Sequence, residues 1–197
     1  MEVKPITPRQ QEIVNAARKI IASKGIKSLT VRRIAKELKI TDGALYRHFD
    51  TKNGIIRLLI RDIKNTLLNN IHQAAGKSND PLQKLKNIFL SHLSYAEQRK
   101  GLTFIIINET LSMKDKKLQK EMFGVVCKYL KTIEEILSEG VSSGKFRKNI
   151  DAASASLAFF GMVQATVTIW SLSGFGSFLM PSRLNELFFV YKKGVLI

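Results

Sequence analysis

The sequence carries helix-forming signals along nearly its whole length, and this regularity limits its fold more than any other feature. Apolar residues recur with the period of an α-helix, whereas the alternation typical of strands is nearly absent. Thr7, Pro8 and Gln10 supply an N-cap, a proline at the first helical position and a capping-box glutamine, and Gly25 predicts the end of that helix. The pattern therefore predicts an all-α fold of about nine helices.

The same kinds of signal predict where the other helices begin and end. Asp80 and Gln83 have the spacing of a second capping box, and Gly140 with Gly144 predicts a turn. Further helix starts are predicted at Thr30, Thr41, Thr51, Asp80, Asp151 and Pro181, and a break at Gly101. The third helix, from Thr41 to Phe49, is very short, with Leu45 and Phe49 turned inward.

The charge is strongly basic and unevenly distributed. The chain has 32 Lys and Arg against 16 Asp and Glu, a net charge of +16. The first 60 residues carry +8, as much as the remaining 137. A surface this positive favours a polyanionic partner, nucleic acid or an anionic membrane, and the asymmetry places the contact near the N-terminus.

Composition also excludes several protein classes. An apolar fraction of 45% is that of a globular chain and excludes a disordered one. The one cysteine, Cys127, excludes a disulfide framework and a cysteine-based zinc site, and it fits a reducing cytoplasm. No apolar run follows the N-terminus, so we expect no signal peptide and a cytoplasmic protein.

The N-terminal segment has the spacing of a helix-turn-helix. Its second and third predicted helices are separated only by Lys39 and Ile40. In such a unit the second helix of the pair enters the major groove and reads base edges from its N-terminal end. Gly43 is a poor helix former, and its expected benefit is a close approach of the backbone to the duplex.

Three stretches of this segment resemble the DNA-binding domain of the tetracycline-repressor (TetR) family. They are residues 30–35 (TVRRIA), residues 43–49 (GALYRHF) and Thr51-Lys52. The resemblance implies a dimeric transcription regulator, usually a repressor. It also implies two domains, residues 1–52 for DNA binding and residues 53–197 for ligand binding and dimerisation. One departure is Asn53-Gly54, where family members commonly have an acidic residue.

The resemblance also implies which side chains contact operator DNA. Thr41, Gly43 and Ala44 would contact base edges or a thymine methyl group, and Arg47 a guanine or a phosphate. The full set is Thr30, Arg32, Arg33, Thr41, Gly43, Ala44, Tyr46, Arg47, His48 and Lys52. Taken singly, each of these could instead be a solvated charge or a packing residue.

Residues 152–182 contain no charged side chain over 31 positions, which raises the question of a membrane span. Six polar residues between 152 and 172 favour a helix buried in protein instead. A helix that is apolar on all sides needs cover on all sides, so we expect a second copy to supply it. The prediction is a homodimer through the last two helices, reading a near-palindromic operator.

The C-terminal body is expected to hold a small hydrophobic effector. Aromatic and aliphatic residues at helical spacing are core residues more often than ligand contacts, so both interpretations stay open. His92 and Glu109 are possible polar anchors. The candidate lining residues are Phe89, Leu93, Phe104, Ile107, Phe123, Val126, Phe160, Gln164 and Trp170.

Three classes of function remain to be compared. The sequence favours a ligand-responsive DNA-binding repressor. It shows no Ser-His-Asp arrangement, phosphate loop or metal-ligand spacing, so we expect no enzyme, cofactor or metal. A nonspecific architectural DNA protein would show little preference for a palindrome, and the small, polar start of the third helix argues against it.

Overall fold

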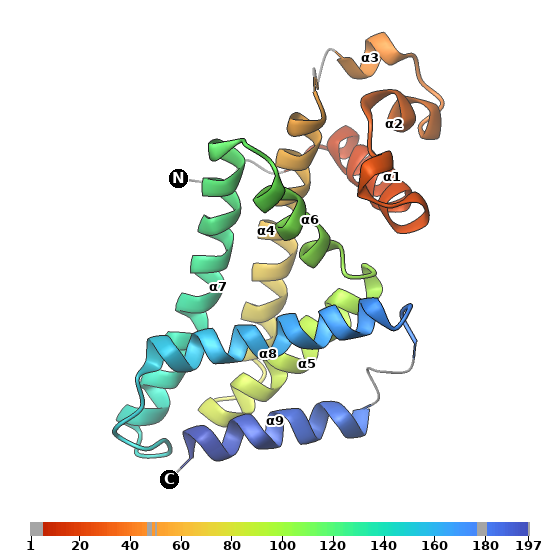
Figure 1. Cartoon of the computed structure of the whole chain (residues 1–197). Coiled ribbons are helices and arrows are strands. Elements are labelled where there is room, and N and C mark those ends of the chain that lie inside the picture. Colours follow the sequence, from red (N-terminus) through yellow and green to blue (C-terminus); the bar gives the residue numbers. More distant parts are fainter. Residues whose placement is uncertain (1–5, 47–48, 50, 177–180, 197) are drawn as a thin grey trace. The chain divides into compact units, whose positions relative to one another are not determined.

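The computed structural model describes residues 6–46, 49, 51–176 and 181–196. These residues form nine α-helices and one short 3₁₀ helix (Figure 1), which confirms the all-α expectation. The helices are α1 (Pro8–Lys24), η1 (Ile26–Ser28), α2 (Val31–Glu37), α3 (Asp42–Tyr46), α4 (Lys52–Ala75), α5 (Pro81–Gln98), α6 (Leu102–Ser112), α7 (Lys116–Ser142), α8 (Ala152–Leu172) and α9 (Pro181–Val195).

Local capping bonds explain why most helices begin where the sequence predicts. The Thr7 side chain accepts a hydrogen bond from the Gln10 amide, and the Gln10 side chain accepts one from the Thr7 amide, so the first capping box is complete. Gly25 ends α1 with a φ of 74°, in the left-handed region that favours glycine. Asp151 likewise caps α8 through the Ser154 amide.

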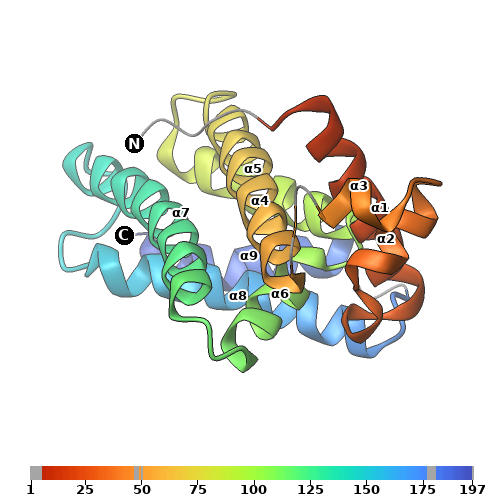
Figure 2. The same cartoon turned by 90° about the horizontal axis from the view of Figure 1, so that it is seen from above.

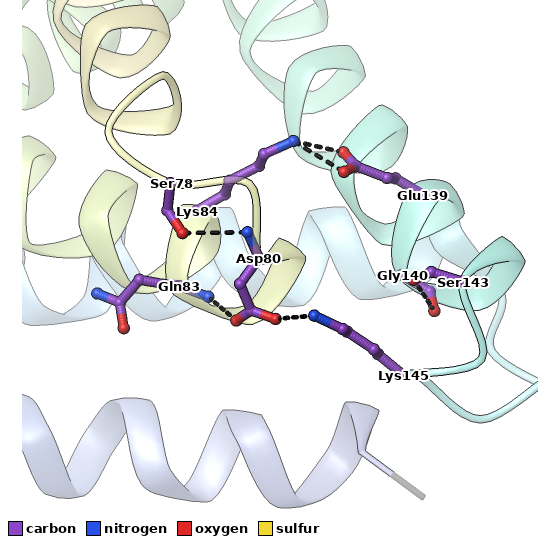
Figure 3. Close-up of polar contacts among 8 residues, drawn as sticks. All are labelled: Ser78, Asp80, Gln83, Lys84, Glu139, Gly140, Ser143 and Lys145. Carbon is purple, nitrogen blue, oxygen red and sulfur yellow. Dashed lines mark hydrogen bonds and ion pairs between the residues drawn. The ribbon is translucent and has the colours of Figure 1, made fainter.

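The second capping box is only half formed, which differs from the prediction. Asp80 accepts the Gln83 amide, but the Gln83 side chain donates to Asn87 and the Asp80 amide donates to Ser78. Figure 3 shows that the Asp80 carboxylate also holds the ammonium of Lys145, from the turn after α7. Hydrogen bonds from Lys145 and from the Gln83 amide keep the pKa of Asp80 below its ordinary value.

Packing divides the chain into two compact units. The first contains the described residues within 1–65 together with 105–123, and the second contains 66–104 with the described residues of 124–197. Helices α4, α6 and α7 contribute residues to both units. The functional boundary expected at residue 52 stays a prediction.

In the first unit, α1 packs on α2 and α2 packs on α3. Ile13, Ala17, Ile34 and Leu45 are almost completely buried, so each of the three helices packs through one apolar face. This arrangement leaves the opposite faces of α2 and α3 exposed.

In the second unit, α5 packs against α8 and α9, which lie side by side in both Figure 1 and Figure 2. Phe89 of α5 contacts the rings of Phe159 and Phe188 at centroid distances of 6.2 and 5.9 Å. The Tyr191 hydroxyl donates to the Ala155 carbonyl at 3.0 Å, which ties α9 to α8.

Helix α7 continues through Gly140 to Ser142, so the part of the predicted turn at Gly140 is wrong. The predicted turn at Gly144, with a φ of 71°, is confirmed. After that turn the chain folds back on α7: the amides of Lys145 and Phe146 both donate to the Gly140 carbonyl.

Among the described helices, α8 is the one long and apolar enough to cross a membrane, by length and composition alone. Only 28% of its most apolar stretch is buried. A single chain therefore leaves much of α8 uncovered, and the cover expected from a second copy stays a prediction. The open side of α8 carries Leu157 and Leu172, which are 61% and 82% exposed.

Candidate nucleic-acid interface and effector site

The second helix of the N-terminal segment begins at a threonine cap. The Thr30 hydroxyl accepts the Arg33 amide at 3.2 Å, while Val31 and Ile34 are buried against the core. Arg32 and Arg33 are exposed. The Arg33 guanidinium donates to the Ser28 carbonyl at 3.2 Å, which holds it beside the first turn of α2.

The third helix presents the expected residues to solvent. The Thr41 hydroxyl accepts the Ala44 amide at 3.3 Å and so starts α3. Thr41, Gly43 and Tyr46 are exposed and Ala44 is half-buried, whereas Leu45 is completely buried. Two further predicted contacts, Arg47 and His48, lie outside the described residues.

Among the residues that the structure describes, none packs against Gly43 in a way that requires glycine. A Cβ built at this position would have no atom within 4 Å. Glycine in a helix costs about 1 kcal/mol relative to alanine, so its presence on an open face needs another explanation. Close approach of a partner to the α3 backbone would provide one.

Lys52, the expected phosphate contact on α4, already has a carboxylate partner. Its ammonium donates to the Glu109 carboxylate of α6 at 2.6 Å, and the two side chains are 33% and 17% exposed. A DNA phosphate would therefore have to compete with Glu109 for this charge.

Two more polar contacts join the start of α4 to the start of α7. The Asn53 amide donates to the Asp115 carboxylate at 2.9 Å, and Arg57 donates to Glu121 at 2.9 Å. Hydrogen bonds from the Leu118 amide and from Asn53 hold the pKa of Asp115 below its ordinary value. The residue that departs from the family pattern, Asn53, thus has a structural partner that sequence reasoning missed.

The structure brings together some of the predicted effector residues and separates others. Phe89, Leu93 and Trp170 are buried, and the contacts of Phe89 with Phe159 and Phe188 are those of a core residue. Phe123 is 67% exposed, so in the single chain it lines no enclosed space. The half-buried residues, for which an effector role stays a prediction, are Phe104, Ile107, Val126, Phe160 and Gln164.

A buried polar pair lies among these apolar residues. The Nδ1 atom of His92 on α5 is 3.1 Å from the Tyr129 hydroxyl on α7, and the Tyr129 ring contacts Phe160 of α8. Burial lowers the pKa of His92 to about 4 and raises that of the Tyr129 phenol. Both groups are therefore neutral near pH 7 and can exchange hydrogen bonds without a buried charge.

The second unit also has a polar surface groove of about 470 Å³ between α4 and α5, which the sequence did not indicate. None of the predicted effector residues lines it. Its lining is Asn70, Gln73, Ala74, Lys77, Asn87, Leu90, Ser91, Ser94, Tyr95 and Gln98. Over the described part of the chain, no three His, Cys, Asp or Glu side chains are grouped closely enough to hold a metal ion.

Two family models match the chain. Residues 13–59 match the family of bacterial regulatory proteins of the tetR family, and residues 61–184 match the C-terminal region of YsiA-like protein.

Among curated proteins, the chain is 25% identical to the fatty acid metabolism regulator protein of Bacillus subtilis over 166 residues, 84% of this chain and 85% of that protein. It is 29% identical to the HTH-type transcriptional repressor KstR2 of Mycolicibacterium smegmatis over 153 residues, 73% of this chain and 70% of that protein.

Solved structures show the same fold. The fatty acid degradation regulator FadR of Bacillus halodurans superposes with a TM-score of 0.85 at 24% identity, covering 97% of this chain and 98% of that one. FadR of Bacillus subtilis in complex with stearoyl-CoA gives a TM-score of 0.82 at 23% identity, covering 93% and 98%.

Proposed function

This chain belongs to the tetR family of bacterial regulatory proteins, and from that premise we propose that it is a repressor that binds a near-palindromic operator as a homodimer. We further propose that an acyl-CoA thioester releases it. Its relatives include a fatty acid metabolism regulator and a transcriptional repressor, which are not enzymes, and the chain is assigned to the transcriptional regulators.

The observation that carries the proposal is the exposed face of α3. Thr41, Gly43 and Tyr46 face solvent there, on a helix whose Leu45 is fully buried. An exposed helix with small residues at its start fits a major groove, where it can read base edges. The +8 charge of the first 60 residues supplies attraction to the phosphate backbone.

The open side of α8 and α9 supports the homodimer. Leu157 and Leu172 of α8 and Val190 of α9 are 61%, 82% and 70% exposed. Apolar side chains exposed together along neighbouring helices mark a surface that binds another protein. A second copy of the same two helices would bury them in a twofold interface. A twofold dimer that reads successive major grooves needs its two reading helices about one DNA turn, ~34 Å, apart.

The effector proposal rests on the chemistry of the second unit. Aromatic and aliphatic side chains around Phe160 and Val126 suit an acyl chain, and the neutral His92–Tyr129 pair offers hydrogen bonds beside them. The solved structure of FadR from Bacillus subtilis contains stearoyl-CoA, whose phosphates would be attracted by a chain of charge +16.

Helix α4 is the element through which the effector would act. It begins at Lys52, directly after the DNA-binding helices, and it contributes residues to both packed units. An effector changes operator affinity only if it binds the two conformations of the dimer differently. We propose that the acyl-CoA-bound conformation is the one that no longer fits the operator.

The test is operator selection from random duplexes, followed by titration with stearoyl-CoA, stearate and coenzyme A. We expect selection of an inverted repeat, release by stearoyl-CoA, and little release by either fragment at the same concentration. Failure of stearoyl-CoA to release the operator, measured together with its binding, would exclude the effector proposal. Equal affinity for the inverted repeat and a scrambled duplex would favour an architectural DNA protein instead.

A charge placed on the α8–α9 face should break the dimer. We expect Val190→Asp to sediment as a monomer at micromolar concentration and to lose most of its operator affinity, because a buried unpaired carboxylate opposes association. Leu111→Asp is the matched control for oligomeric state, since Leu111 and Val190 are both 70% exposed and Leu111 is on α6. Equal sedimentation of both variants as dimers would contradict the proposed interface.

A further inference from the structure

The corner between α6 and α7 carries an unpaired cluster of positive charge. We call its four members the corner lysines: Lys114, Lys116, Lys117 and Lys120. All four are exposed, and none has a carboxylate partner among the described residues. The acidic side chain among them, Asp115, is engaged with the Asn53 amide and with the amides of Lys117 and Leu118.

Polar contacts hold this corner against the first turns of α4. Asn53 bonds to Asp115 at 2.9 Å, and Arg57 bonds to Glu121 at 2.9 Å. Residues 105–123 belong to the same packed unit as α1, α2 and α3. The corner lysines are therefore fixed beside the end of the helix-turn-helix, where α4 begins.

Ion pairing near the start of α4 decides which lysines are available to DNA. Lys52 at the start of α4 is paired with Glu109 at 2.6 Å, whereas the nearby corner lysines have no such competitor among the residues that the structure describes. Free ammonium groups gain most from a phosphate, because no existing ion pair has to be broken first.

We propose that the corner lysines are a second contact to the DNA backbone, supplied by the α6–α7 corner rather than by the helix-turn-helix. The proposal rests on the DNA binding proposed above and adds a surface to it. Contacts to phosphates carry no sequence information. The corner therefore contributes affinity and orientation on any duplex, and base reading stays with α3.

The experiment compares two double variants on the same helix. Lys116→Gln/Lys117→Gln removes two corner charges. Lys128→Gln/Lys131→Gln removes two exposed charges further along α7 and is the control. Affinity is measured against salt concentration by fluorescence anisotropy, on the selected operator and on a duplex of arbitrary sequence. Circular dichroism confirms that both variants fold.

Log affinity falls as log salt rises, and we expect this fall to be less steep in the corner variant. The magnitude of the slope should decrease by about 0.9 for each phosphate that the corner no longer neutralises. Its affinity at low salt should fall about tenfold or more, by the same factor on both duplexes, while the control keeps the wild-type slope. A slope equal to that of the control would overturn the proposal.

Two further outcomes would also overturn it. Weaker binding of stearoyl-CoA with unchanged DNA binding would assign the corner to the effector phosphates. Weaker binding only to vesicles containing anionic lipid would assign it to a membrane surface. If the wild-type chain selects no operator, the proposed function itself fails. That outcome is distinguishable from failure of the corner proposal, because operator selection uses the wild-type chain alone.

Discussion

Replacing Gly140 with alanine is expected to lower the free energy of unfolding by about 3 kcal/mol, a large fraction of the stability of an ordinary domain. A Cβ at this position would lie 2.1 Å and 2.2 Å from two ring carbons of Phe146. Phe146 is completely buried, and its amide is bonded to the Gly140 carbonyl, so the ring has no free direction in which to move. Chemical denaturation measures the change.

The same helix contains a matched control for this prediction. A Cβ at Gly124, which is exposed on α7, would have no atom within 4 Å. Gly124→Ala should therefore raise the free energy of unfolding by up to about 1 kcal/mol, through helix propensity alone. Phe146→Leu combined with Gly140→Ala should cost less than the sum of the two single changes, because the smaller leucine leaves room for the new Cβ and that Cβ fills part of the cavity. Stabilisation by both Gly→Ala variants would show that Phe146 does not constrain Gly140.

The second large effect is a loss of stability on mild acidification, caused by His92. Its folded-state pKa is about 4, lowered by burial from an ordinary 6.5. Between these values the unfolded chain binds a proton that the folded chain does not, so stability falls as the pH falls. The expected loss is about 2 kcal/mol between pH 6.5 and 5, and it increases further toward pH 4.

The pH range separates this effect from the acidic groups. Asp80, Asp115 and Asp151 have lowered pKa values, so their contribution is lost only at lower pH, as they are protonated in the folded state. Unfolding is therefore measured from pH 7 to 5. His92→Gln should flatten the dependence in this range, whereas His72→Gln, at an exposed position, should not. An unchanged slope in His92→Gln would assign the effect to another group.

Sequence patterns predicted the parts of the fold that depend on neighbours within one helical turn. The Thr7–Gln10 box, the Thr30 cap and the Asp151 cap each join atoms three residues apart, so the residue types alone indicate them. The exposed face of α3 follows in the same way from the helical period around Leu45.

Features that join distant parts of the chain were decided by tertiary packing. Lys52 and Glu109 are 57 residues apart, and the Asp80–Lys145 pair that accompanies the half-formed capping box spans 65. The glycine at position 140 predicts a turn, yet Gly140 lies inside α7, where the Phe146 ring packs against it. Such contacts depend on which surfaces meet after the helices have packed, and the residue pattern around each partner gives no sign of the other.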